Sequence, residues 1–443
     1  MKCINCGTDN NLQERTANQG RCKRCQHSFV FEPTAMGNIK ITDPMFAKVI
    51  ADISAKNTLF FTSKQLLYLL DIRVKAKSFS LVGFGCLYLF SNFWVTLFSG
   101  GILNSIISAN LLLITNLAYN LLLITNLAYQ ACVIIYLYNQ IKSTKLNYPS
   151  RQKSAQALRG IGILILVIGT FTTLFVLSSF SGFTIVVILG MLSLFLGTRQ
   201  ISKNQSTQDF LISQSQFQEW LNKWQQINGV PAKILPSPRE EVAPATINSD
   251  VTAYSFDRLV VCNSSTIAQL LIANNFHFEN NCAILSITGY PQSIFATTME
   301  MLRRNPDLQV YALHDCTPRG INLVNHLRSS DAWFLNSNVA IIDVGLLPRQ
   351  IIATQQGMFI QDSPASAQEA KKLAVDVRLT LTTEELAWLD SGKFVELESF
   401  TPQRLIQILQ RGIAGSRNLE ADDSSLIIIG DSGSDIYAVE SFG

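Results

Sequence analysis

Two long apolar stretches without any charged residue dominate this sequence of 443 residues. No charged side chain lies between Lys77 and Lys142, and none lies between Arg159 and Arg199. About 20 consecutive apolar residues span a bilayer, so each stretch is long enough for two crossings. Charged residues make up only 15% of the chain and hydrophobic residues 48%, which also favours a membrane protein. We therefore expect an integral membrane protein with soluble segments on either side of the apolar stretches.

Small and polar residues divide each apolar stretch and set the expected helices. Ser99-Gly100-Gly101 interrupts the first stretch, and the segment from Ser178 to Gly182 interrupts the second. We expect a transmembrane unit over 79–198, with helices at 79–99, 103–139, 160–179 and 182–198. Lysines and arginines gather before the first helix, in the middle loop and after the last helix, while the two short turns carry no charge. The positive-inside rule then predicts that 103–139 crosses once and that both soluble ends are cytoplasmic.

An exact repeat of ten residues lies inside the second expected helix. The segment from Asn110 to Tyr119 recurs as Asn120 to Tyr129. Ten residues turn a helix by about 1000°, so the two copies differ by roughly 80° in azimuth and build no single polar stripe. We interpret the repeat as a duplication that lengthened a helix. No expected helix carries an ionisable residue, which favours an anchor in the lipid bilayer, or a surface for homo-oligomers, over a transporter.

The N-terminus carries two cysteine pairs with the spacing of a metal site. Cys3 and Cys6 are separated by two residues, and so are Cys22 and Cys25. Four thiolates fill the tetrahedral shell of Zn²⁺ and leave no open position, so the pattern predicts a structural zinc ribbon over residues 1–32. Such a ribbon provides a docking surface for a partner. The other five cysteines lie in apolar runs and are interpreted as buried residues in a reducing compartment.

Residues 40–77 are expected to form a small helical module, with one helix opened by Asp43-Pro44 and a second that begins near Ser63. The segment 199–250 is expected to hold an amphipathic helix and a proline-containing linker. Its apolar residues recur at helical spacing, so the helix either lies at the membrane surface or packs against the C-terminal domain. These residues are Phe217, Trp220, Leu221, Trp224 and Ile227.

From residue 251 onward the pattern changes to short apolar runs that alternate with helical stretches. The runs 258–262, 283–288, 309–314 and 339–344 predict buried parallel strands, joined by helices near 265–275, 291–304 and 319–329. This pattern indicates a doubly wound α/β domain with a mostly parallel sheet over 251–415, followed by a C-terminal extension over 416–443. Ligands bind such sheets at the carboxyl ends of the strands. Asp315, Arg319 and Asp343 are expected at that edge.

The segment Asp315-x-Thr317-Pro318-x-Gly320 follows the third expected strand, and Gly345-Leu346-Leu347-Pro348-Arg349 follows the fourth. Together with Val395 to Phe400, these segments resemble the Toprim domain of the type IIB topoisomerase A subunit and of the related meiotic double-strand-break protein. The resemblance covers about 255–412. Lys64 to Tyr68 is also similar to the family's cleavage motif, which would make Tyr68 the strand-cleaving tyrosine. A tyrosine in a core or an interface is the alternative.

The resemblance implies a glutamate and two aspartates that hold Mg²⁺ beside a phosphodiester. Here the glutamate position is Cys262 and the second aspartate is Thr317, so only Asp315 remains, with Asp343 as a further candidate. Mg²⁺ is therefore not expected to bind strongly. Thr317-Pro318 also fits a helix cap, and Arg319 at the helix start is a weak candidate for holding a ligand phosphate.

Three functions follow from these patterns. The first is a membrane-anchored, non-catalytic protein whose zinc ribbon and degenerate Toprim-like domain bind a partner or ligand. The second is a tethered Mg²⁺-dependent enzyme that acts on DNA or nucleotides and uses Asp315, Asp343 and Tyr68. The third is a membrane-bound tether for nucleic acid. From Asp250 onward, 13 lysines and arginines stand against 22 acidic residues, which disfavours a grip on DNA by this domain. The missing carboxylates favour the first function.

Overall fold

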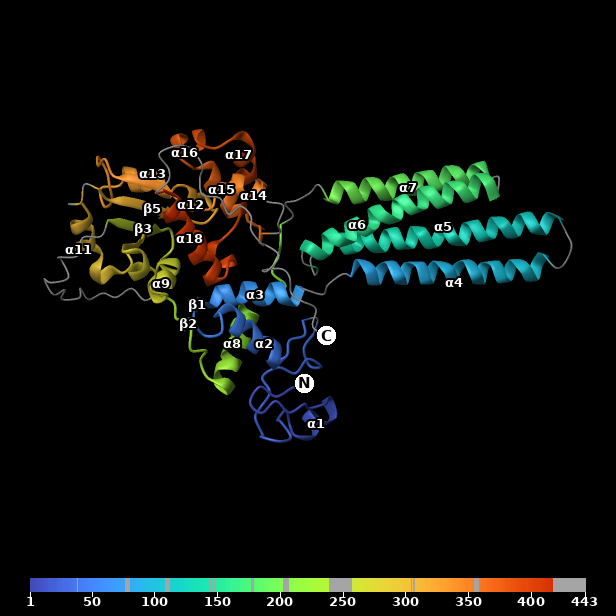
Figure 1. Ribbon diagram of the computed structural model, residues 1–443, viewed down its shortest axis with the longest axis horizontal. Coiled ribbons are helices and arrows are strands. Elements are labelled where there is room, and N and C mark those ends of the chain that lie inside the picture. Colours follow the sequence, from blue (N-terminus) through green and yellow to red (C-terminus); the bar gives the residue numbers. More distant parts are fainter. Residues whose placement is uncertain are drawn as a thin grey trace. The chain divides into compact units, whose positions relative to one another are not determined.

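The computed structural model divides into two compact units (Figure 1). It describes residues 1–37, 39–75, 80–107, 112–143, 146, 148–176, 179–201, 207–238, 257–303, 305, 307–353 and 358–416. One unit holds Met1–Val74 together with the described residues from Thr207 onward, and the other holds the described residues of Lys75–Ser206. Most of the expected linker and almost all of the expected extension over 416–443 lie outside the described residues.

The second unit is a bundle of apolar helices. It contains α4 (Leu81–Ile107), α5 (Leu112–Lys142), α6 (Tyr148–Leu164), two π-helical segments, η1 (Ile165–Gly169) and η2 (Thr172–Val176), and α7 (Phe180–Ile201). In the described part of the chain, four spans are long and apolar enough to cross a membrane: Leu81–Phe98, Leu122–Lys142, Ser150–Phe175 and Phe180–Arg199. The residues of the repeat from Leu112 to Tyr129 lie within α5, which is one helix, as the sequence predicted.

The predicted ends of these helices need correction. The expected turn at Ser99-Gly100-Gly101 is wrong, because α4 continues through it to Ile107. Serine and glycine break helices mainly where water competes for the backbone; in an apolar stretch the backbone satisfies its own hydrogen bonds and the helix continues. The third helix begins at Tyr148 and not at 160, with Pro149 in its first turn, where its missing N–H costs nothing.

The first unit begins with two cysteine-bearing loops that flank α1 (Leu12–Ala17), followed by α2 (Asp43–Ile53), β1 (Phe61–Thr62) and α3 (Ser63–Lys75). The Thr42 side chain caps α2 and accepts from the Met45 N–H at 3.3 Å, while Thr62 caps α3 through the Gln65 N–H at 3.1 Å. After the apolar helices the chain returns with α8 (Gln214–Asn228) and β2 (Ile234–Leu235). Strand β2 pairs in parallel with β1.

Helix α8 completes the core of the N-terminal helices. Its buried side chains Phe217, Trp220, Leu221 and Trp224 belong to one cluster with residues of α2 and α3. The Trp224 ring lies 4.8 Å from the Phe46 ring, and the Trp220 ring lies 6.1 Å from the Phe31 ring. The structure therefore supports neither a helix at the membrane surface nor one that packs on the C-terminal sheet. The expected module over 40–77 is thus one part of a core that also needs residues after 207.

The C-terminal part is the predicted doubly wound domain. Its sheet consists of β3 (Arg258–Cys262), β4 (Cys282–Ser286), β5 (Gln309–Leu313) and β6 (Ala340–Asp343), all parallel, in the order β4-β3-β5-β6. Alternate strand residues point to opposite faces, so both faces are apolar and each needs a cover. Helices α9 (Ser265–Ala273), α10 (Phe276–Asn280) and α18 (Pro402–Ser416) cover one face. Helices α11 (Gln292–Arg303) and α13 (Leu323–Ser329) cover the other.

A smaller cluster of helices packs beside the carboxyl ends of β5 and β6. It comprises α12 (Pro318–Ile321), α14 (Pro348–Ala353), α15 (Pro364–Lys371), α16 (Val375–Leu379) and α17 (Thr383–Asp390) around their own apolar core. The short strands β7 (Gln361–Asp362) and β8 (Lys393–Phe394) pair antiparallel, and the 3₁₀ segment η4 (Leu397–Ser399) leads into α18. This cluster forms one wall of the strand-end edge.

Candidate functional sites

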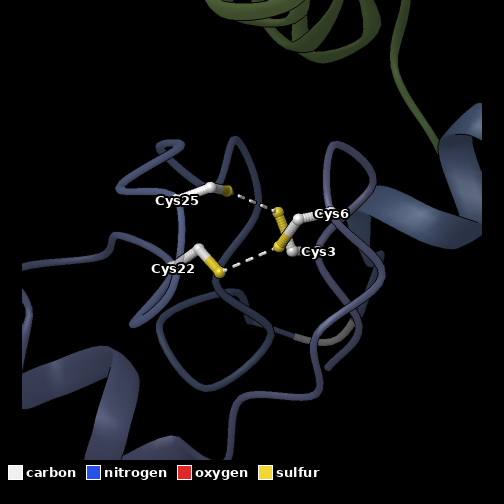
Figure 2. Close-up of side chains that lie close together, drawn as sticks. All are labelled: Cys3, Cys6, Cys22 and Cys25. Atoms are coloured by element: carbon white, nitrogen blue, oxygen red, sulfur yellow. Dashed lines mark hydrogen bonds between the residues drawn. The ribbon is translucent and has the colours of Figure 1, made fainter.

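The four N-terminal cysteines come together on two matching loops (Figure 2). In the first loop the Gly7 N–H donates to the Cys3 carbonyl at 2.8 Å, and in the second the Gln26 N–H donates to the Cys22 carbonyl at 3.0 Å. The residue after each cysteine pair has a positive φ, +70° at Gly7 and +59° at Gln26. Each loop therefore turns sharply and directs both of its sulfur atoms to the same point.

The sulfur geometry fits a tetrahedral metal ion. All four Sγ atoms lie within 4.8 Å of one another, with Cys3 and Cys25 at 3.7 Å and Cys6 and Cys22 at 3.6 Å. Metal–sulfur bonds of about 2.3 Å, as found for Zn²⁺, place tetrahedral sulfur atoms at about this spacing. The cluster can hold a metal ion, as the cysteine spacing predicted.

The strand-end edge of the sheet holds Asp315 just after β5. The Asn263 amide donates to its Oδ1 at 2.9 Å, and the Thr317 hydroxyl donates to the same oxygen at 2.6 Å. Thr317 also caps α12 by accepting from the Gly320 N–H at 3.0 Å. Glycine is required at 320 because a Cβ there would lie 2.3 Å from the Asp315 carbonyl oxygen. The Asp-x-Thr-Pro-x-Gly segment is thus a closed turn that packs on itself.

Burial and hydrogen bonding act in opposite directions on the ionisation of Asp315. Burial raises the pKa of the Asp315 carboxyl, and the hydrogen bonds from Thr317 and Asn263 oppose that rise without cancelling it. The position expected for a glutamate is Cys262, a fully buried residue of β3 whose thiol pKa is raised by burial. Neither residue offers the exposed carboxylate that a Mg²⁺ site needs.

Asp343 pairs with His314 and does not face Asp315. The fully buried imidazole points Nε2 at Asp343 Oδ1, 3.0 Å away, and Nδ1 at the Asp315 carbonyl oxygen, 2.8 Å away. Both ring nitrogens face oxygen acceptors, so a protonated imidazole satisfies both. Burial is the largest single influence on the pKa of His314 and lowers it, but the charge and hydrogen bond of Asp343 and the contact with the Asp315 carbonyl together outweigh burial and raise that pKa. Burial raises the pKa of Asp343, but its interactions with His314 and the Gly345 N–H outweigh burial and lower that pKa.

Tyr68 lies in the interface between α3 and the C-terminal domain. Its hydroxyl donates to Glu396 Oε2 at 2.6 Å and accepts from the Gln361 amide. The ring is 1% exposed and packs between Phe210 and Phe359, each 4.9 Å away. Burial and then the Glu396 charge raise the pKa of Tyr68 far above its usual value.

Two glutamates and a lysine complete this interface. Lys64 Nζ lies 2.7 Å from Glu396 Oε1 and 3.8 Å from Glu398 Oε2. Burial raises the pKa of Glu398 to about 7, with Lys64 opposing and Glu396 and Asp315 reinforcing the rise. Asp315 therefore has two acidic neighbours. The sequence contains them in the family-like segment Val395–Phe400, but no expected strand end pointed to them as site residues.

Arg319 lies on the surface and forms an ion pair with Glu369. Its Nε is 3.1 Å from Glu369 Oε1, and its side chain is 82% exposed. Helix α12 has only four residues, so its N-terminus has little dipole to hold a phosphate.

The strand order, the Asp315 turn and the adjoining acidic segment define the C-terminal part as a Toprim-like domain. Residues 259–409 match the family model that describes the Toprim domain shared by Spo11 and the A subunit of topoisomerase 6. The match covers about a third of the chain and excludes the cysteine cluster and the apolar helices. No curated protein matches the chain.

Proposed function

We propose that this chain is a membrane-anchored protein that binds a partner or ligand on its cytoplasmic side without catalysing a reaction. The cysteine loops, α2, α3, α8 and the Toprim-like domain act as one binding unit. Four helices of sufficient length and apolar character support the anchor. The basic residues that flank them support a cytoplasmic position for both soluble segments. Zn²⁺ in the four-cysteine cluster would hold the two N-terminal loops together.

The state of the strand-end residues carries the non-catalytic proposal. Asp315 already accepts two hydrogen bonds, and the resemblance aligns Cys262 and Thr317 with the other positions at which the family has acidic residues. In the described residues, the four cysteines are the one group of three or more acidic, histidine or cysteine side chains that converge as a metal site. Tyr68 is buried and hydrogen-bonded, so its oxygen is not presented to a phosphodiester.

The family match supports a DNA-related alternative. The charge of Glu396 raises the pKa of Asp315, and the charge of Asp315 raises the pKa of Glu398, so the three carboxyl groups are neighbours. Tyr68 contacts Glu396. A shift of the N-terminal helices away from the domain would expose Tyr68 beside three carboxyl groups. A tethered Mg²⁺-dependent enzyme on DNA or nucleotides would then use Asp315 with these glutamates.

The full chain, purified in detergent, separates the two functions. We expect one zinc ion per chain by elemental analysis and no Mg²⁺-dependent cleavage of supercoiled plasmid. We also expect no salt-dependent binding of duplex DNA by fluorescence anisotropy. In cells, the chain should stay in the membrane fraction after an alkaline carbonate wash.

Variants make the result decisive. Mg²⁺-dependent cleavage that is lost in Asp315→Ala and in Tyr68→Phe, but kept in Asp376→Ala, would establish the enzyme and refute the non-catalytic proposal. Asp376 is an exposed residue of α16 and serves as the matched control. If cleavage is absent, Tyr68→Phe should still lower the thermal unfolding midpoint, because Glu396 keeps Lys64 but loses the Tyr68 hydroxyl as a donor, at a cost of about 1–2 kcal/mol.

A further inference from the structure

The helices of the second unit form a partly open cavity of about 490 Å³. That volume lies within the range of about 300–1,000 Å³ typical of small-molecule sites. Its walls come from α4, α5, the end of α6, both π-helical segments and α7, and most of the lining side chains are aliphatic or aromatic. None of the described residues that line it carries a charge. The cavity therefore suits an uncharged and largely apolar molecule.

One wall of the cavity carries a line of polar side chains. Tyr88 on α4 donates to Gln130 Oε1 on α5 at 2.8 Å. The Gln130 amide lies 3.4 Å from Asn126 Oδ1, and the Asn126 amide lies 3.5 Å from the Thr96 hydroxyl oxygen. Contacts this long are weak hydrogen bonds, so Asn126 can exchange them for a closer partner. Amides are costly in an apolar helix bundle, and such residues commonly serve a binding function.

The opposite wall is built on the π-helical segments. Segment η1 contributes Ile168 and Gly169, and η2 contributes Thr172 and Thr173. Both threonine hydroxyls donate to the Gly169 carbonyl, at 3.0 and 2.7 Å. Single π-helical turns are rare and are frequent at functional sites. Here a glycine and two threonines of these segments line the cavity and place oxygen atoms in its wall.

We propose that this cavity binds a neutral lipid, a hydrocarbon chain that carries a hydroxyl or carbonyl group. The polar group bonds to the Asn126 amide and the chain fills the apolar remainder. Diacylglycerols and isoprenoid quinones share this chemistry. A phospholipid headgroup does not fit, because its phosphate would meet no cation among the lining residues. The inference depends on the membrane anchor proposed above.

Photo-crosslinking of the full chain in phosphatidylcholine nanodiscs tests the site. Three diazirine-bearing probes are compared: a diacylglycerol, an isoprenoid quinone and a phosphatidylcholine. We expect at least one neutral probe to label α4, α5 or the π-helical segments more strongly than the phosphatidylcholine probe, with peptides mapped by mass spectrometry. Comparing the first two probes identifies the source. Asn126→Leu should weaken that labelling about threefold, the value of one hydrogen bond of about 0.6 kcal/mol in a bilayer.

Two further variants complete the test. Leu89, 61% exposed at the cavity edge, becomes a plug in Leu89→Trp, which should reduce labelling to the level of the phosphatidylcholine probe. Thr184→Val on α7 makes a similar polar-to-apolar change away from the cavity and should leave labelling unchanged. Equal labelling by all probes, or labelling insensitive to Asn126→Leu and Leu89→Trp, would overturn the lipid site alone. Failure of the chain to enter nanodiscs would overturn the membrane anchor as well.

Discussion

Glu398 is the residue whose ionisation is most closely tied to the contact between α3 and the Toprim-like domain. Its side chain is 15% exposed, and Lys64 Nζ is 3.8 Å from its Oε2. The charged groups that face it are Lys64 from α3, Glu396 from the preceding segment and Asp315 from the strand end. Burial and two acidic neighbours outweigh one partly exposed lysine. The folded protein therefore binds a proton at Glu398 more readily than the unfolded chain does.

This environment predicts a pH-dependent stability. The pKa of Glu398 rises from 4.5 to about 7 in the folded state. Between these values the folded state holds a proton that the unfolded state has released, so stability falls as the pH rises. The contribution is fully present below pH 4.5 and is lost as the pH passes 7. Glu398→Gln removes it and should stabilise the protein at pH 8, by about 3 kcal/mol at most, with little change at pH 4.5.

Thermal unfolding of the full chain in detergent at several pH values measures this effect. The pKa of His314 is also raised, but His314 is present in both proteins, so the difference between wild type and variant isolates Glu398. Asp376→Asn, at an exposed position, controls for the loss of one negative charge. If wild type and Glu398→Gln differ in unfolding temperature by the same amount at pH 4.5 and at pH 8, the raised pKa of Glu398 is contradicted.

At the scale of elements, α8 decides how the N-terminal loops are held. Trp224 is 5% exposed and its ring lies 4.8 Å from Phe46 and 6.3 Å from Phe31. Asn228, at the end of the same helix, contacts His27 in the second cysteine loop at 3.0 Å. The helix thus links the cysteine cluster to α2, although α8 lies far from both in the sequence.

Trp224→Ala should destabilise the soluble unit by about 3–5 kcal/mol, because a large buried side chain leaves a cavity. The cysteine cluster should also release its metal to a chelator faster, since Phe31 loses a packing partner. Lys223→Ala is the matched control on the same helix. Its side chain is 54% exposed and pairs only with Glu219, so a change below about 0.5 kcal/mol is expected. Unchanged unfolding in Trp224→Ala would instead favour a helix at the membrane surface.

The elements also show which parts of the fold could be predicted from the sequence. The strands were located to within two residues, because a short apolar run between turn signals, with helical stretches on both sides, is typical of a buried parallel strand. The end of α4 was wrong, because the breaking effect of Ser99-Gly100-Gly101 was judged for a helix in water. The partner of α8 was missed because an amphipathic pattern identifies a buried face without identifying what covers it.

Of the candidate sites, the sequence predicted the cysteine cluster but not the contacts that surround Tyr68 and Asp343. The cysteine cluster followed from spacing alone, since metal geometry fixes the ligands. The contact of Tyr68 with Glu396 joins residues 328 positions apart, and no local pattern carries that information. The pairing of Asp343 with His314 was also missed. It depends on the strand order, which places the end of β6 beside the end of β5, and the sequence pattern does not give that order.

At the scale of the whole molecule, the apolar helices are an insertion into the first unit, which we expect to be soluble. Asp71 on α3 accepts from the backbone N–H groups of Leu211 and Ile212, at 2.7 and 3.2 Å. The two chain segments that enter and leave the helix bundle are therefore held together by the soluble unit itself. Strand β2 pairs with β1 across the same insertion. We therefore predict that the first unit folds without the bundle.

Replacing residues 76–206 with a Gly/Ser linker of about eight residues should yield a soluble, folded protein. Such a linker spans up to about 27 Å, and the Asp71 contacts with Leu211 and Ile212 keep the two chain segments that it joins close together. We expect a single species by size-exclusion chromatography without detergent, cooperative thermal unfolding and retention of the cysteine-bound metal. A matched version with Trp224→Ala should lose stability as it does in the full chain. The contrary result is a shortened protein that aggregates or loses its metal under conditions in which the full chain stays folded and keeps its metal. That result would show that the helix bundle contributes to folding and is more than an anchor.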